Sequence, residues 1–380
     1  MKLRTHFIQT YFKYFKHLGN TKAMNVLRKI TRQLDDHAMR LRLFFVDLGW
    51  ISVKAEIAIA HVSLISNCNL RCRGCLYGRD FMPKEKLDLE TVKRMLDEFK
   101  ELGIPKVHFY GGEPLLHVGI YEMVAHATQL GIFTTLGSNA VMLERKNIDR
   151  LHAAGLRHVG IGIYGIGEHY DNYVNIDGSF DKLEQNLKYV RQTYPDISLT
   201  FSWLLSKKTC NLSSLNEIFS LSQRYQIPFD FSLIHYDFPY FTDGEQHELQ
   251  FFADDRPLIN NFIQAALKLK EQYPSLLANS EEAIRSIPDW LIEKADMRVP
   301  CHRYRRLWIG PNGVVRVCQK NCDLGNIRTT SLKDMLFNKL HQKASQDCYE
   351  LNCTNCHVGY DERVRLHGPS KAKYSKANPF

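Results

Sequence analysis

Residues 57–75, IAIAHVSLISNCNLRCRGC, decide the fold and lead directly into the chemistry of the chain. The first eight residues are mostly apolar, with β-branched members, a pattern that predicts a buried strand over 57–64. Cys68, Cys72 and Cys75 follow within a few residues of the end of this strand. Three thiols therefore fall within eight residues, immediately after a strand of the predicted core.

Cysteines at this spacing are suited to a metal centre. Three thiols separated by three and two residues can wrap a tight loop around one cubic iron–sulfur cluster. They supply one ligand fewer than the four irons of such a cluster, so one iron is left to bind an exchangeable ligand. A structural zinc site is the alternative, but it would need a fourth Cys or His. The nearest candidate, His61, lies in the predicted strand, where we expect a core or barrel-interior position.

Composition places these thiols in a reducing compartment. The chain has 380 residues, ten of them Cys, and no apolar run approaches the ~20 residues that span a membrane. Lys13 interrupts the apolar segment 7–15, so we expect no secretory signal. The sequence therefore predicts a cytoplasmic protein, in which clustered Cys residues bind metal or react rather than form disulfides.

Downstream of the cysteine loop, strand-like and helix-like segments alternate. About six βα units in succession predict a parallel sheet with right-handed crossovers, covered by helices. An open doubly wound sheet and a barrel both fit, and in either the loops at the carboxyl ends of the strands carry the chemistry. The predicted strands are 57–64, 107–110, 133–136, 158–164, 198–205 and 229–234, and the predicted helices are 89–102, 121–130, 148–154, 183–192 and 215–225.

Glycine-containing motifs follow the next two predicted strands. Gly111-Gly112-Glu113-Pro114 follows the second strand, and Gly137-Ser138-Asn139 follows the third. Alone, the first motif would be an ordinary βα turn with a capping Glu. In this order after the cysteine triple, the two motifs resemble the signatures of the radical S-adenosylmethionine (radical SAM) superfamily. Val159–Gly165 and Leu199–Asn211 are similar to later strands of that family, so the resemblance covers roughly residues 57–235.

The resemblance implies a fold, a chemistry and a set of contacts. The implied fold is α/β, a partial (β/α)6 TIM-type barrel with N-terminal helices and a small cysteine-rich C-terminal domain. In the family, a 4Fe-4S cluster and S-adenosylmethionine together generate a 5′-deoxyadenosyl radical that abstracts a hydrogen atom from the substrate. A flavodoxin- or ferredoxin-type reductant is the implied electron donor. The implied cluster ligands are Cys68, Cys72 and Cys75, and the implied S-adenosylmethionine contacts are Gly111, Gly112, Glu113, Pro114, Ser138 and Asn139.

One position departs from the family pattern. The residue before the third cysteine is commonly aromatic in the family and helps to hold adenine, but here it is Gly74. Tyr77, two positions after Cys75, is the expected substitute.

A hairpin is predicted near the C-terminus, between two further cysteines. Cys301 and Cys318 are separated by sixteen residues, and Gly313 lies five residues before Cys318. Segment 308–317 predicts two strands joined through Pro311-Asn312-Gly313. Such a turn would return Cys318 toward Cys301.

These cysteines, together with a later pair, resemble the twitch form of the SPASM extension of radical SAM enzymes. The resemblance implies one auxiliary 4Fe-4S cluster, held by Cys301, Cys318, Cys353 and Cys356. Cys322 or Cys348 could replace a member of this set, and zinc on four cysteines is the alternative.

The basic residues are concentrated at the N-terminus. Residues 1–50 hold ten Lys and Arg against three Asp, so this segment carries about +7 of the formal net charge of +9. A basic helix with an apolar stripe can bind an anionic membrane surface, whereas packing of that stripe on the core is the alternative. We therefore expect either peripheral membrane association through residues 1–50 or an ordinary surface helix, and no nucleic-acid partner.

The predicted organisation has five parts, and the substrate stays open. The parts are a basic helical segment 1–55, a barrel core 56–240, a helical connector 241–299, a twitch-like domain 300–365 and a basic tail 366–380. The favoured substrate class is a small metabolite such as a sugar or an aminocyclitol, with a peptide or a lipid-linked molecule as alternatives. A non-catalytic metal-binding or redox-sensing protein is the alternative from another class. Cys210, just past the predicted strand 198–205, is a candidate hydrogen-atom donor to a substrate radical.

Overall fold

The computed structural model describes residues 22–236, 240, 248–319 and 322–377. The chain divides into two compact units, Met1–Ile51 and Ser52–Phe380. In the first unit, α2 (Lys22–Asp47) is one helix of 26 residues. The apolar stripe predicted within residues 7–15 lies outside the described residues. Within the described chain, no helix combines the length and the apolar character needed to cross a bilayer.

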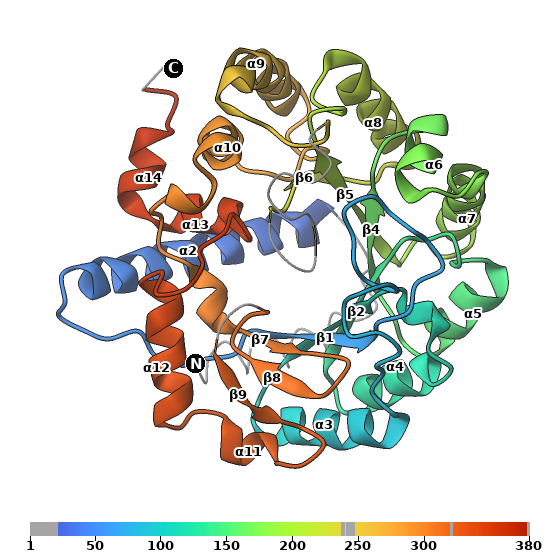
Figure 1. The fold of residues 1–380 in the computed structure, drawn as a ribbon, viewed down its shortest axis with the longest axis vertical. Helices are drawn as coiled ribbons and strands as arrows, with labels where there is room; N and C mark the ends of the chain where they lie inside the picture. The colour runs from blue at the N-terminus through green and yellow to red at the C-terminus, as the bar shows by residue number, and fades with distance from the viewer. Residues whose placement is uncertain (1–21, 237–239, 241–247, 320–321, 378–380) are drawn as a thin grey trace. The chain divides into compact units, whose positions relative to one another are not determined.

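The second unit is built on one nine-stranded sheet, in the order β6-β5-β4-β3-β2-β1-β7-β8-β9. Strands β1 to β6 are parallel, each beside its neighbour in the sequence, and their connecting helices cover the outside of the curved sheet (Figure 1). The predicted partial (β/α)6 barrel is therefore confirmed. The elements are β1 Ile59–Ile65, α3 Leu89–Glu101, β2 Lys106–Gly111, η1 Pro114–Leu116, α4 Ile120–Gln129, β3 Phe133–Ser138, α5 Arg145–Ala153, β4 His158–Ile163, α6 Glu168–Val174, α7 Ser179–Thr193, β5 Ser198–Leu205, α8 Leu212–Tyr225 and β6 Phe229–Leu233.

The two faces of the parallel sheet differ in polarity. On the outer face, apolar side chains such as Val62, Phe109 and Phe201 are fully buried beneath the helices. The alternate positions belong to the inner face, because successive side chains of a strand point to opposite sides. Most of these inner positions are polar or glycine and only partly buried, so water reaches this face. They include His61, Lys106, His108, Gly137, His158, Gly160, Thr200, Ser202 and Asp230.

The C-terminal strands extend the same sheet beyond β1. β7 (Arg306–Ile309) pairs in parallel with β1, and β8 (Val314–Arg316) and β9 (Asp323–Asn326) continue in antiparallel order. The predicted hairpin is confirmed, and Gly313 in its turn has φ +86°, which favours glycine.

Helices complete the second unit, and their bounds are η2 Ala253–Asp255, α9 Arg256–Gln272, α10 Glu281–Glu293, η3 Lys294–Asp296, η4 His302–Arg305, α11 Leu332–Met335, α12 Lys339–Tyr349, α13 Tyr360–Leu366 and α14 Gly368–Lys373. The finer domain boundaries expected from the sequence stay predictions.

Candidate active site

The cysteine loop follows β1 and holds its three thiols close together. Cys68, Cys72 and Cys75 are partly buried and form no disulfide. Burial raises the pKa of the Cys72 thiol well above its usual 9.0, and the neighbouring thiols of Cys75 and Cys68 raise it further. Burial likewise raises the pKa of Cys68 to about 12. Thiolates gathered away from water need a positive partner, so this donor set fits the iron of a cluster.

The described residues offer no set of ligands for a single metal ion. In the described part of the chain, no three Cys, His, Asp or Glu side chains are arranged to hold one ion.

Gly111 and Gly112 bring the end of β2 against the start of the cysteine loop. The Gly112 N–H donates to the Ile65 carbonyl at 2.7 Å, and the Glu113 N–H donates to the Asn67 carbonyl at 2.9 Å. A Cβ on Gly112 would lie 2.1 Å from the Asn67 oxygen, and a Cβ on Gly111 would lie 2.3 Å from the Ile65 oxygen. Glycine is therefore required at both positions for the two loops to meet.

Glu113 is a fully buried carboxyl that joins the loops after β2 and β3. It accepts hydrogen bonds from the Ser138 hydroxyl at 3.0 and 3.1 Å, from the Asn139 N–H at 3.0 Å and from the Leu115 N–H at 3.1 Å. Burial raises the pKa of Glu113 from 4.5 to about 7, although the hydrogen bonds from Asn139, Leu115 and Ser138 oppose this rise. The carboxyl is thus used inside the protein, where it positions the turn at 138–139. A direct contact of Glu113 with S-adenosylmethionine stays a prediction.

Asn139 connects that turn to the cysteine loop. Its Nδ2 donates to the Asn69 Oδ1 at 2.8 Å and lies 3.9 Å from the Sγ of Cys68. The three motifs that the sequence analysis placed after β1, β2 and β3 are therefore brought together through Glu113 and Asn139.

Helix α6 holds the cysteine loop from another side. The backbone N–H groups of Arg71 and Arg73 donate to the carbonyls of Val174 and Tyr173 at 3.1 and 2.9 Å. These carbonyls belong to the last turn of α6, where a helix has no internal partners for them. Helix α6 is not predicted from the sequence, because its seven residues are too few for a clear helical period.

Tyr77 lies in a buried aromatic cluster beside the cysteine loop. Its ring centroid is 4.7 Å from that of Phe81 and 6.5 Å from those of Tyr110 and Tyr240. The indole N–H of Trp308 on β7 donates to the Tyr110 hydroxyl at 2.6 Å, which connects the cluster to the C-terminal strands. The predicted contact of Tyr77 with adenine stays a prediction.

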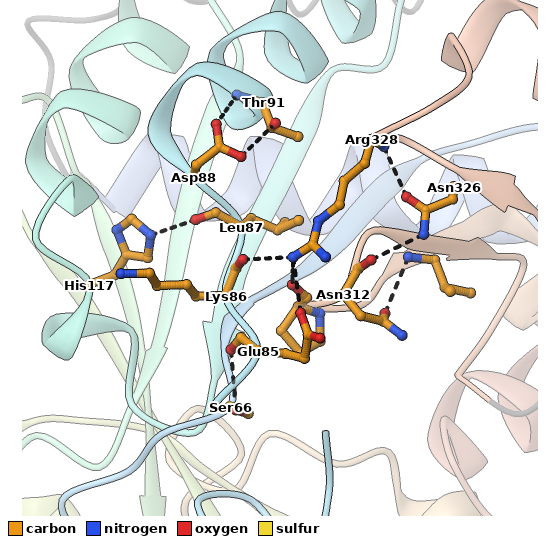
Figure 2. Close-up of polar contacts among 12 residues, drawn as sticks. Ser66, Glu85, Lys86, Leu87, Asp88, Thr91, His117, Asn312, Asn326 and Arg328 are labelled. Carbon is orange, nitrogen blue, oxygen red and sulfur yellow. Dashed lines mark hydrogen bonds and ion pairs between the residues drawn. The ribbon is translucent and has the colours of Figure 1, made fainter. Parts of the chain in front are cut away.

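Arg328 ties the C-terminal strands to the segment that follows the cysteine loop (Figure 2). Its Nη2 donates to the Lys86 carbonyl at 2.9 Å and to the Pro311 carbonyl at 3.1 Å, and it pairs with the Glu85 carboxylate at 3.0 Å. The Glu85 carbonyl in turn accepts from the N–H and the hydroxyl of Ser66, two residues before Cys68. One guanidinium thus joins the C-terminal hairpin to the barrel near its cysteine loop.

The second cysteine group is centred on Cys348, in α12. The Cys348 thiol interacts with the thiols of both Cys301 and Cys318, and the interaction with Cys348 lowers the pKa of Cys301. Burial raises the pKa of Cys353, and the thiols of Cys301 and Cys318 raise it further. Three thiols therefore interact directly, and Cys353 lies near enough to be affected by two of them. Four thiols are the donor set of a second iron–sulfur cluster.

From the sequence, Cys348 is expected only as a replacement ligand. It lies thirty residues from Cys318, and only the packing of α12 brings it into the group. Cys356 and the full ligand set stay predictions.

Cys210 lies in the connection between β5 and α8. Its side chain is 1% exposed, and burial raises the pKa of its thiol to about 12, with Asp255 as the second cause. Its role as a hydrogen-atom donor stays a prediction.

The inner face carries polar groups that the sequence analysis did not assign. The Nε2 of His61 lies 3.0 Å from the Nη1 of Arg306, and the His61 and His108 rings are 5.2 Å apart. On β6, Asp230 accepts from the Ser202 hydroxyl at 3.1 Å, and burial raises its pKa to about 6. A parallel strand buried on both faces would be continuously apolar. The polar residues at every second position of β2 and β5 were the signal for an open inner face.

Comparisons with known proteins agree with this geometry. Residues 62–209 match the family model described as the radical SAM superfamily. The chain therefore contains a radical SAM domain, the domain that defines this superfamily of enzymes.

Among curated proteins, the chain is 25% identical over 213 residues to Fe-coproporphyrin III synthase of Methanosarcina barkeri, covering 55% of this chain and 52% of that protein. It is 31% identical over 163 residues to PqqA peptide cyclase of Bradyrhizobium diazoefficiens, covering 42% of each protein. The chain thus spans about half the length of these curated relatives, or less.

Solved structures share the fold over more of the chain. SuiB of Streptococcus suis gives a TM-score of 0.60 at 15% identity, covering 82% of this chain and 76% of SuiB. The anSMEcpe structure with bound AdoMet gives 0.59 at 14% identity, covering 83% of this chain and 96% of that one. At these identities the likeness shows the fold alone.

Proposed function

We propose that this protein is a radical SAM enzyme whose catalytic 4Fe-4S cluster is held by Cys68, Cys72 and Cys75. When bound, the cluster and S-adenosylmethionine supply a 5′-deoxyadenosyl radical, which takes a hydrogen atom from the substrate. The observation that carries this proposal is the junction of three strand-end motifs. The three-thiol loop is fixed by Gly112 and contacted by Asn139, as one continuous site requires.

The residues around the cysteine loop position it in different ways. Gly111 and Gly112 fix the path of the loop through the close approach of two backbones. Glu113 positions Asn139, and the end of α6 holds the loop between Cys68 and Cys75. These contacts limit the movement of the thiol-bearing backbone, so the ligands are preorganised for a cluster.

The C-terminal cysteines are proposed to hold one auxiliary 4Fe-4S cluster in a twitch-like domain. The proposed ligands are Cys301, Cys318, Cys348 and Cys353, with Cys356 as the alternative fourth ligand. The contacts of the Cys348 thiol with those of Cys301 and Cys318 support this choice.

The proposed substrate is a small metabolite, with a peptide as the alternative. The partly buried polar residues on the inner face support a small polar molecule. The alternative is supported by PqqA peptide cyclase, named for a peptide, and by SuiB, solved with the precursor peptide SuiA. A flavodoxin- or ferredoxin-type protein is the proposed reductant.

The test is cleavage of S-adenosylmethionine by the anaerobically prepared full chain. With dithionite as reductant, we expect 5′-deoxyadenosine from the wild type and none from the triple variant Cys68→Ala/Cys72→Ala/Cys75→Ala. Iron should fall from about eight to about four atoms per chain, because one of two cubic clusters is lost. Product formation by the triple variant would disprove the proposal.

A second set of variants tests the auxiliary ligands. Cys348→Ala should lose about four irons per chain and keep the catalytic cluster. Cys322→Ala removes a thiol outside both proposed sets and should keep all of the iron. If Cys348→Ala keeps its iron and Cys356→Ala loses it, Cys356 is the fourth ligand instead.

A further inference from the structure

Arg363 on α13 is among the largest fully buried side chains of the described chain, with 1% of its surface exposed. Its Nε donates to the Val299 carbonyl at 3.0 Å, and its Nη2 donates to the same carbonyl and, at 3.2 Å, to the Oδ1 of Asn355. Its Nη1 donates to the Cys356 carbonyl, and its Cζ lies 4.6 Å from the ring centroid of Trp290. Hydrogen bonds and an aromatic ring therefore fix the guanidinium in one position.

These contacts join two segments that carry C-terminal cysteines. The Val299 carbonyl lies two residues before Cys301, a proposed cluster ligand, and the Cys356 carbonyl belongs to the alternative fourth ligand. The Cys356 N–H donates at 2.8 Å to the Oδ1 of Asn355, which also accepts from Arg363. One guanidinium thus holds the backbone before Cys301 against the backbone at Cys356.

The charge of Arg363 is not balanced by a carboxylate. Its acidic neighbours on α13 pair with other cations, Asp361 with Arg365 at 3.7 Å and Glu362 with Arg306 at 3.2 Å. Among the described residues, the hydrogen-bond acceptors of Arg363 are two backbone carbonyls and one amide, all of them neutral. A buried charge without a counter-charge is strongly unfavourable, because it has lost its hydration and gains no ion pair. The folded chain therefore favours a negative group near this guanidinium.

The C-terminal thiols can supply that negative charge. The Cys348 thiol is the largest cause that lowers the pKa of Cys301, and Arg363 lowers this pKa further. Burial raises the pKa of Cys353, and Arg363 opposes the rise. Thiolates are the ligands of an iron–sulfur cluster, so a cluster bound here would bring negative charge to the buried guanidinium.

We propose that Arg363 is a positioning residue of the auxiliary cluster site and the fixed counter-charge of that cluster. This assignment rests on the proposed function, because it concerns the auxiliary cluster named there. A fixed cation stabilises the reduced cluster more than the oxidised one, because the reduced cluster carries one more negative charge. Arg363 therefore raises the reduction potential of the auxiliary cluster.

The experiment measures the midpoint potential of the auxiliary cluster in the anaerobic full-length chain, by redox titration followed with electron paramagnetic resonance. The background is the triple variant Cys68→Ala/Cys72→Ala/Cys75→Ala, so that only the auxiliary cluster gives a signal. We expect Arg363→Met to lower the equilibrium constant for reduction at least tenfold, which corresponds to about 59 mV for one electron. Arg363→Lys keeps the charge and should keep this constant within threefold of the background.

Lys339→Gln is the matched control, because Lys339 is exposed at the start of α12, the helix that carries Cys348. Water and salt screen this charge, so its removal should change the equilibrium constant less than threefold. A residue that only clamps the two segments would change the stability of the protein and leave the potential of the cluster unchanged.

The outcomes separate the counter-charge from the proposed function. Absence of iron from the background variant overturns the proposed auxiliary cluster itself. When iron is bound, an unchanged potential in Arg363→Met, or an equal decrease in Arg363→Lys, overturns the counter-charge alone. If Arg363→Met loses its iron, retention of iron in Arg363→Lys supports the counter-charge, whereas loss from both variants indicates a structural clamp and overturns it.

Discussion

Replacing Gly112 by Ala tests whether the close approach of two loops builds the catalytic cluster site. The added Cβ would lie 2.1 Å from the Asn67 carbonyl oxygen and 2.4 Å from that of Ser66. Real Cβ contacts begin near 3.0 Å, so one of the two backbones must move by about 0.9 Å, the difference between 3.0 and 2.1 Å. Both atoms that block the Cβ belong to backbone, so no flexible side chain can absorb this movement.

The cost follows from the hydrogen bonds that this movement breaks. The bonds from Gly112 to Ile65, at 2.7 Å, and from Glu113 to Asn67, at 2.9 Å, both cross the junction. Each contributes about 0.5–1.5 kcal/mol, so losing both lowers the free energy of unfolding by about 1–3 kcal/mol. A decrease of this size lowers the thermal midpoint by several degrees and displaces the segment that leads to Cys68.

The assay combines iron content, 5′-deoxyadenosine formation and thermal unfolding of the anaerobic protein. Gly160→Ala is the matched control, because a Cβ there meets its nearest atoms at 3.8 Å, an ordinary contact. We expect Gly112→Ala to lose about four irons per chain and most of its cleavage activity, and Gly160→Ala to keep its iron. Full iron and full cleavage in Gly112→Ala would refute the reasoning that this junction fixes the cluster loop.

Three other perturbations give further expectations. Glu113 has a pKa of about 7 in the folded chain against 4.5 ordinarily. Between pH 4.5 and 7, the folded state therefore binds a proton that the unfolded state does not. The contribution of Glu113 to the free energy of unfolding should therefore fall by about 2 kcal/mol from pH 5.5 to 8. In chemical unfolding, Glu113→Gln should remove this pH dependence, and the exposed control Glu90→Gln should keep it. Arg328→Met should lower the free energy of unfolding by about 1 kcal/mol, because the ion pair of Arg328 with Glu85 is only half-buried. An unchanged free energy of unfolding would show that the contacts of Arg328 add no stability. The full chain should pellet with anionic vesicles at low salt and not at ~1 M salt, because of the charge of residues 1–50 and the exposed apolar side chains of α2. Absence of pelleting at low salt contradicts this expectation.

The barrel could be predicted from the sequence because its signals are local. The strand 57–64 and the helix 89–102 are both observed within two residues, as β1 and α3, because buried strands and amphipathic helices have different periods. The cysteine triple and the glycine motifs could be ordered around one edge of the sheet, because parallel strands place their carboxyl ends together.

The missed features depend on packing between distant segments. Cys348 lies thirty residues after Cys318, and only the packing of α12 brings its thiol to those of Cys301 and Cys318. The spacing of the cysteines in the sequence does not predict this contact. The loop-holding role of α6 depends on two backbone carbonyls, which any sequence supplies. Arg306 contacts His61 only because β7 joins the sheet beside β1, a pairing between residues almost 250 positions apart.

That pairing also determines how the two cysteine groups lie relative to the inner face of the barrel. β7 runs parallel to β1, with Arg306 opposite Ile59, so the open end of the β7–β8 hairpin lies beside the start of β1. Cys301 and Cys318 flank this open end, whereas Cys68 follows the other end of β1. The inner-face residues of β1 and β2 therefore lie between the two groups of thiols. A substrate bound on this face would therefore lie between the proposed catalytic cluster and the proposed auxiliary cluster.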